Sequence, residues 1–219
     1  NVQEKNILVY LNDEYSRRVS ADLNWSGEVK DSQYDYLMIV DANLAAFKTD
    51  RIMDKNIKYY LQAEGDKFRA RVEVSYQNNG WFDWQTTRYR TFTRIYTPYN
   101  SALISSSGSL EDVKSHLEKN IYHPKTYFTS FLSVEPKDKK TIVFEYYLPD
   151  SISDKIIKNN FYSLLIQKQP GNNVSKFEVY LNFSQSVKSV SSEGEIDVSD
   201  KEIYWSNSLN KDYLLEVKF

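Results

Sequence analysis

The densest group of side chains that could carry chemistry lies between residues 41 and 54. Its main candidates follow an apolar run, LMIV at residues 37–40, which is typical of a buried strand. Open α/β sheets bind ligands at the carboxyl ends of their strands, so a polar site is one interpretation. The alternative, which we favour, is a joint between a preceding domain and the β domain that follows, built from turn residues and ion pairs. The candidate residues are Asp41, Asn43, Lys48 and Asp50.

A second candidate is an aromatic loop between two expected strands. It contains Trp81, Phe82 and Trp84, and Tyr89 follows shortly after. Flat aromatic faces suit the C–H faces of sugars, so Trp81, Trp84 and Tyr89 could form a glycan-binding platform. The alternative is structural, because large aromatic rings mostly serve buried contacts, here at the open end of a sheet or against a neighbouring domain.

Most catalytic and metal-binding classes find no support. The chain has no cysteine, which excludes disulfides, thiolate metal sites and a cysteine nucleophile. His116 and His123 are seven positions apart, but His123 precedes Pro124, where helix is disfavoured, and no further ligands cluster with them. No nucleophile–base motif, phosphate loop or dinucleotide turn is present. A glycosidase carboxylate pair stays open, since only its spatial separation would identify it. We expect no cofactor and no metal, and an enzymatic role stays uncertain.

The overall charge gives no reason to expect an anionic partner. The 219 residues carry a formal net charge of −2, which supports neither nucleic-acid binding nor attraction to an anionic membrane. No apolar run reaches the length of a membrane span, so we expect no direct membrane insertion by this chain. Lys137, Lys139 and Lys140 form a short basic turn, which is most simply a solvated hairpin end.

The elements that must position these residues change character near residue 50. Residues 6–11 and 35–41 are expected strands, and between them Asp13 can cap a helix whose apolar face is Tyr15, Val19 and Leu23. Strand, helix and strand would make residues 1–50 a short α/β segment, the tail of a preceding domain or an adaptor to it.

From residue 57 onward the apolar period is two. Gly65-Asp66 predicts a tight hairpin, and further strands are expected near residues 67–76, 89–97, 102–106, 127–134, 141–148, 161–168, 176–183 and 212–219. A helix is expected over residues 109–120, where Ser109 and Asp112 resemble a capping box. Residues 150–160 could hold a short helix, and residues 184–199 an edge strand with a loop. The prediction for residues 51–219 is a mainly β fold, an antiparallel immunoglobulin-like β-sandwich with one inserted helix.

Several segments resemble a bacterial envelope family, the domain of unknown function 4012, in its C-terminal region. The resemblance rests on LVYLNDEYSRRVSADLNWSGEV and YDYLMIVDANLAAFKTDRIMDKNIKYYLQ, then on YRTFTRIYTPYNSALI, VEPKDKKTIVFEYYLP and FYSLLIQKQPG. It covers roughly residues 7–183. The most specific parts are VDAN followed by KTDR, and IQKQPG. Where the family often has glycine in the loop after VDAN, this chain has Ala45, Ala46 and Phe47.

The resemblance implies an extracytoplasmic domain of a membrane-anchored cell-envelope protein, tethered by a transmembrane helix outside this chain. We therefore expect a non-catalytic docking or protein-interaction domain, whose partner is the preceding domain of the same polypeptide or another envelope protein. One alternative is a carbohydrate-binding module for cell-wall glycans. Another is an accessory part of an envelope glycopolymer transferase whose active site lies in a missing N-terminal region.

Overall fold

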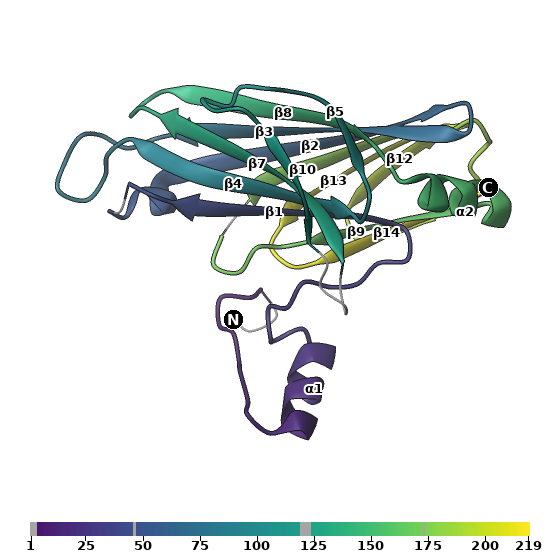
Figure 1. Ribbon diagram of the computed structural model, residues 1–219, viewed down its shortest axis with the longest axis horizontal. Coiled ribbons are helices and arrows are strands. Elements are labelled where there is room, and N and C mark those ends of the chain that lie inside the picture. The colour runs from purple at the N-terminus through teal and green to yellow at the C-terminus, as the bar shows by residue number, and fades with distance from the viewer. Residues whose placement is uncertain (1–3, 46, 119–123, 173) are drawn as a thin grey trace.

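The computed structural model describes residues 4–45, 47–118, 124–172 and 174–219, in which two seven-stranded sheets face each other (Figure 1). Sheet A runs in the order β11 (Ser189–Ser191), β14 (Tyr213–Lys218), β9 (Phe161–Gln167), β1 (Asp35–Asn43), β4 (Tyr89–Pro98), β7 (Lys125–Val134), β6 (Lys114–Glu118). Sheet B runs in the order β12 (Glu195–Ser199), β13 (Glu202–Leu209), β10 (Val174–Asn182), β2 (Met53–Glu64), β3 (Lys67–Asn78), β8 (Lys139–Tyr147), β5 (Ala102–Ser107). The predicted mainly β sandwich is confirmed.

Most neighbouring strands are antiparallel, but the centre of each sheet is a parallel pair. In sheet A, β1 lies parallel to β9, and in sheet B, β2 lies parallel to β10. The predicted Gly65-Asp66 hairpin joins β2 to β3, and Gly65 has the positive φ of 66° that such a turn needs. The short helix α2 (Asp150–Asn159) precedes β9, as the sequence indicated.

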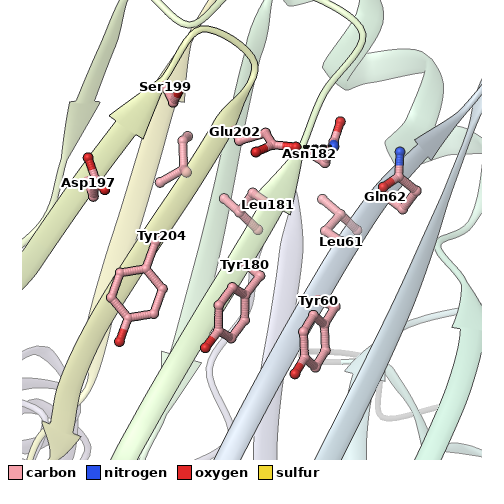
Figure 2. Close-up of a pocket in the computed structure, with 11 residues that line it drawn as sticks. Tyr60, Leu61, Gln62, Tyr180, Leu181, Asn182, Asp197, Ser199, Glu202 and Tyr204 are labelled. Carbon is pink, nitrogen blue, oxygen red and sulfur yellow. Dashed lines mark hydrogen bonds between the residues drawn. The ribbon is translucent and has the colours of Figure 1, made fainter.

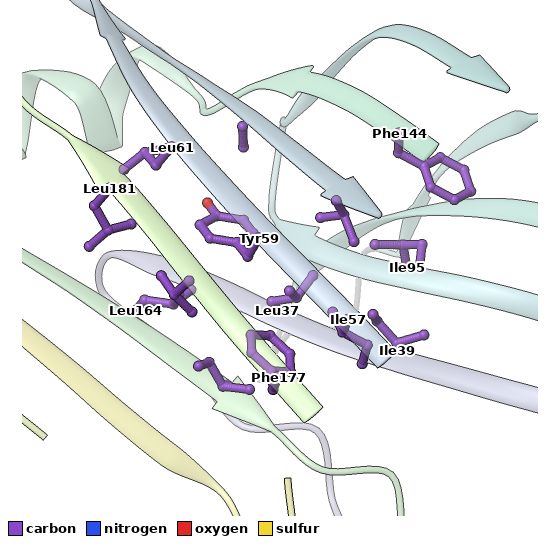
Figure 3. Close-up of a cluster of buried hydrophobic side chains, with 14 of the residues drawn as sticks. Leu37, Ile39, Ile57, Tyr59, Leu61, Ile95, Phe144, Leu164, Phe177 and Leu181 are labelled. Atoms are coloured by element: carbon purple, nitrogen blue, oxygen red, sulfur yellow. The ribbon is translucent and has the colours of Figure 1, made fainter. Parts of the chain in front are cut away.

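The core lies between the two sheets and follows the alternation of the strands. Tyr59, Leu61 and Phe177 of sheet B face Leu37 and Leu164 of sheet A, and all five are almost fully buried (Figure 3). In β3, the inward residues are Phe68, Ala70, Val72, Val74 and Tyr76. Period-two burial therefore sets which face of each strand meets the core.

Strand β1 is apolar at consecutive positions because both of its faces are covered. Leu37 and Ile39 face the core, whereas Tyr36 and Met38 point outward into a second buried cluster. Val29 of the N-terminal segment packs against that cluster. A strand covered on both faces has no reason to alternate, which explains the LMIV run.

The predicted boundary at residue 50 is wrong. Strand β1 lies in the middle of sheet A, so the sandwich begins before residue 50 rather than after it. Residues 6–11 form no strand, and Ile7 and Tyr10 are exposed. The predicted strand–helix–strand unit fails because β1 takes β9 as its parallel neighbour instead. The helix between them is confirmed as α1 (Glu14–Asp22), capped by Asp13, whose carboxylate accepts from the Ser16 N–H.

The predicted helix at residues 109–120 is also wrong, over its described part. Residues 114–118 form edge strand β6, paired with β7, while Leu110 and Leu117 are exposed. Instead of capping a helix, the Ser109 hydroxyl accepts from the Phe131 N–H and donates to the Phe131 carbonyl. The apolar residues have helical spacing, but residues 114–118 gain more by pairing with the long strand β7 than by forming a helix.

A strand that the sequence did not indicate completes sheet B. This is β13, which pairs with β10 and β12 and places Trp205 fully inside the core. The continuous run Ile203-Tyr204-Trp205 and the polar Asn207 in the inward phase hid the alternation. The expected edge strand in residues 184–199 is present as the short strands β11 and β12.

A carboxylate in the core links the two sheets. Asp35, at the start of β1, accepts hydrogen bonds from the hydroxyls of Tyr59 in sheet B and Tyr162 in sheet A. It also accepts from the N–H of Tyr36. Burial raises the pKa of Asp35 to about 6, although the hydrogen bonds from both tyrosines oppose the rise.

Asp35 should therefore make stability depend on pH. Its folded-state pKa exceeds the unfolded value, so the folded state binds the extra proton and loses stability as pH rises from about 4 to 6. Relative to Asp35→Asn, the wild-type free energy of unfolding should fall by about 2 to 3 kcal/mol between pH 4 and pH 7. Urea unfolding of both proteins across this range measures the difference, and a constant difference would contradict the argument.

Candidate functional site

The candidate carboxylate Asp41 is a buried structural group rather than an accessible one. Its side chain is 2% exposed, and it pairs with Lys55 Nζ at 2.7 Å. Its other oxygen accepts from the Tyr76 hydroxyl at 2.8 Å and from the Thr93 hydroxyl at 2.7 Å. No substrate can reach a carboxylate enclosed in this way, so Asp41 offers no basis for catalysis.

The neighbouring polar residues serve the same joint. Gln169, in the connection from β9 to β10, accepts from the Asp41 N–H at 2.9 Å and donates to the Asp41 carbonyl at 2.8 Å. Asn43 Nδ2 donates to Asp50 at 2.7 Å, while Lys48 is exposed. These contacts tie β1 to β2 and to the start of β10. The joint around Asp41 therefore links strands of one sandwich, not two domains as predicted.

The aromatic loop presents some of its predicted residues and buries another. Trp81 and Trp84 are exposed by 64% and 81%, so their rings are accessible. Tyr89 lies in the core at 2% exposure, and burial followed by the nearby carboxylates of Asp41 and Asp50 raises its pKa. Tyr89 therefore cannot belong to a surface platform.

The histidines form no metal site in the described structure. His116 stacks on Tyr127 with ring centroids 4.9 Å apart, and His123 lies outside the described residues. Among the residues that the structure describes, no group of three or more histidine and carboxylate side chains could hold a metal ion.

A surface groove lies on the outer face of sheet B. Tyr60, Tyr180 and Tyr204 sit at paired positions on the adjacent strands β2, β10 and β13 (Figure 2). The rings of Tyr60 and Tyr180 stack at 4.8 Å, and those of Tyr180 and Tyr204 lie 5.2 Å apart. We call this row the tyrosine ladder. It forms one side of a groove of about 330 Å³.

Glu178 fixes the hydroxyl ends of the ladder. It accepts from the Tyr180 hydroxyl at 3.1 Å and from the Tyr204 hydroxyl at 3.2 Å. Lys176 and Lys58 neutralise the Glu178 carboxylate, at 2.9 and 3.6 Å. Partial burial and the hydrogen bond to Glu178 raise the pKa of Tyr180 to about 12, so this hydroxyl stays protonated at neutral pH.

The other side of the groove is polar. Asn182 Nδ2 donates to Glu202 at 2.9 Å, and Gln62, Ser199 and Asp197 lie on the same face (Figure 2). None of the residues lining the groove is a lysine or arginine. Aromatic rings opposite amide and carboxylate groups can hold a neutral, hydroxyl-rich ligand.

Sequence reasoning missed the ladder, although part of its signal is visible. In β2 and β10, Tyr60 and Tyr180 occupy the outward phase, where polar residues are the norm. An aromatic in that phase on two strands hints at a surface feature. The third member, Tyr204, lies in the strand that the sequence did not indicate.

The N-terminal residues are anchored at two places and leave an apolar surface between them. Lys5 Nζ pairs with Asp212 at 2.7 Å, and Gln167 accepts from the Lys30 N–H and donates to the Glu28 carbonyl. Between these anchors, α1 projects below the sandwich (Figure 1). Seven large apolar side chains there are 38–77% exposed: Ile7, Leu8, Tyr10, Leu11, Tyr15, Val19 and Leu23. We call this set the N-terminal apolar face.

Comparisons with known proteins do not assign a family. No protein-family model and no curated protein matches the chain, so the family resemblance stays a prediction. Among solved structures, the chain is similar to a two-domain M1 zinc metallopeptidase E323A mutant bound to L-tryptophan, with 9% identity and a TM-score of 0.38. The chain is also similar to an M1 zinc metallopeptidase E323A mutant from Deinococcus radiodurans bound to a Tyr-Ser-Ala substrate. Here the sequence identity is 9% and the TM-score is 0.37.

In both cases the match covers 76% of this chain and 43% of the other. The chain thus spans less than half the length of these structures. Such low TM-scores assign neither a fold nor an activity. No helix in the described ranges is long and apolar enough to cross a bilayer.

The joint can be tested through Lys55. Lys55→Met leaves the Asp41 carboxylate buried without its cation and should lower the free energy of unfolding by about 3 to 5 kcal/mol. The matched control is Lys58→Met on the same strand, whose ion pair with Glu178 is 41% exposed on the lysine side and should contribute less than about 1 kcal/mol. Chemical denaturation measures both. Equal losses would show that burial of the pair does not matter.

Proposed function

We propose that this chain is a non-catalytic docking domain of a membrane-anchored, extracytoplasmic envelope protein, as the family resemblance implies. The N-terminal apolar face carries the docking proposal. Single exposed apolar residues are ordinary, but seven within residues 7–23 form a patch of the kind that marks an interaction site.

The form of this face suits a partner with its own apolar groove. Tyr15 and Val19 of α1 and its C-cap residue Leu23 recur at four-residue spacing, which is the pattern of a helix that packs in a groove. Asp212, held by Lys5 and Lys30, fixes the ends of the segment to the sandwich. We assign the preceding domain of the same polypeptide as the partner.

Carbohydrate binding is a second candidate function, and the tyrosine ladder groove is the observation that favours it. The groove pairs aromatic rings with Asn182, Gln62 and Glu202, whose amide and carboxylate groups suit sugar hydroxyls. It meets these needs better than the loop of Trp81 and Trp84, where the carboxylate of Asp83 is bonded to N–H groups of its own loop.

Docking predicts protection of the N-terminal apolar face in the longer parent protein. Amide hydrogens of residues 14–22 should exchange roughly tenfold more slowly in the parent than in the isolated chain, while those of β2 stay unchanged. Val19→Asp should restore fast exchange in the parent without lowering the Tm of the isolated chain, because Val19 is exposed by 38%. Identical exchange in parent and isolated chain would contradict docking.

Carbohydrate binding at the groove predicts that substitutions in the tyrosine ladder and the polar side of the groove lower the affinity for glycans. In a screen of neutral cell-wall glycans followed by titration, Tyr180→Ala and Asn182→Ala should each weaken binding roughly tenfold, since each removes a ring or hydrogen-bonding contact. Trp84→Ala is the control and should leave affinity unchanged. Loss with Trp84→Ala alone would move the sugar to the aromatic loop, and absence of binding to every glycan would remove this function.

A further inference from the structure

Two loops gather exposed apolar side chains at one end of the sandwich. Leu44 and Phe47 follow β1, and Trp81, Phe82 and Trp84 lie between β3 and β4; their exposures range from 56% to 81%. The loops are held together, because the Lys48 N–H donates to the Gln85 carbonyl at 2.9 Å. The loop between β3 and β4 projects beyond the sheets at the end opposite α2 (Figure 1). We call these five residues the aromatic tip.

The tip is built to hold its rings outward. Asp83 accepts from the N–H groups of Gln85 and Thr86 at 2.7 and 2.6 Å, and these bonds lower its pKa. The Thr86 hydroxyl donates to the Trp81 carbonyl at 2.9 Å. The exposure of Trp81 and Trp84 therefore comes from a hydrogen-bonded loop rather than from a lack of local structure.

The tip is also locally basic, which the net charge of the whole chain conceals. The turn of residues 135–140 lies beside it, since Lys137 Nζ sits 4.1 Å from the Trp81 ring centroid. Segments 44–54, 79–90 and 135–140 together carry seven lysines and arginines against five carboxylates, a net charge of +2 in a chain of −2. Charge complementarity therefore favours an anionic surface.

We propose that the aromatic tip inserts into the interfacial layer of an anionic lipid bilayer. Tryptophan concentrates at membrane interfaces, and phenylalanine and leucine add apolar area that can be buried there. Nearby lysine and arginine strengthen binding to anionic headgroups. A sugar fits this tip less well, because the carboxylate of Asp83 is used within its own loop and that of Asp54 by Asn79. The contact is peripheral and does not span the bilayer. It revises the expectation, drawn from the net charge and the lack of a long apolar run, that this chain makes no direct membrane insertion.

The test is flotation of the 219-residue chain with vesicles of phosphatidylcholine alone or with about 30% phosphatidylglycerol. We expect binding to the anionic vesicles, weakening in roughly 0.5 M salt, and a blue shift of tryptophan emission on binding. Trp81→Ala with Trp84→Ala should lower the partition coefficient about tenfold or more. Lys48→Glu with Lys139→Glu should lower it to a similar extent on anionic vesicles only.

Matched control variants distinguish binding through the aromatic tip from nonspecific binding of the chain to vesicles. Tyr10→Ser with Tyr15→Ser removes two aromatic rings of similar exposure, 75% and 77%, from the N-terminal apolar face and should leave partitioning unchanged. Lys201→Glu, in the turn between β12 and β13, controls for charge. The proposal is overturned if the chain fails to bind anionic vesicles, or if the tyrosine and tryptophan variants lose binding equally.

Discussion

The sandwich depends on two carboxylates that β1 directs into the core. Asp35 and Asp41 share the inward face of this strand with Leu37 and Ile39, and each is bonded to sheet B, by Tyr59 and by Lys55. A buried carboxylate destabilises the fold unless its oxygens accept hydrogen bonds or pair with a cation. Each carboxylate therefore requires its partner side chains to keep one position. Strand β1 thereby fixes how the two sheets lie on each other, from one end of the core to the other.

The surfaces proposed for binding all rest on this frame. The tyrosine ladder needs β2, β10 and β13 in register, and the parallel pairing of β2 with β10 sets Tyr60 beside Tyr180. The aromatic tip begins where β1 ends and is linked to the joint around Asp41.

The sequence indicated what depends on local pattern. Alternation located most of the strands, and the Asp13 cap located α1. It did not indicate the partner of β1, because a run apolar at every position is equally compatible with a parallel α/β sheet and with a sandwich strand covered by Val29. The tyrosine ladder could not be predicted for the same reason. Its three residues become neighbours only through pairing between strands that are distant in sequence. The ion pair of Asp41 with Lys55 crosses from one sheet to the other, and only the fold reveals it.

The parallel pairs at the centre of both sheets have a consequence for how the chain is made. Asp35 pairs with Leu164 and Asn56 with Lys176, so more than half of the chain separates the partners. Contacts between residues so far apart in sequence form late. The entropy cost of closing the long loop between them comes before any stabilisation from the contact. During synthesis, β1 and β2 emerge long before β9 and β10 and stay unpaired on that edge. Until β9 and β10 have left the ribosome, this chain cannot close its core, and the apolar residues of β1 stay open to contacts with other chains.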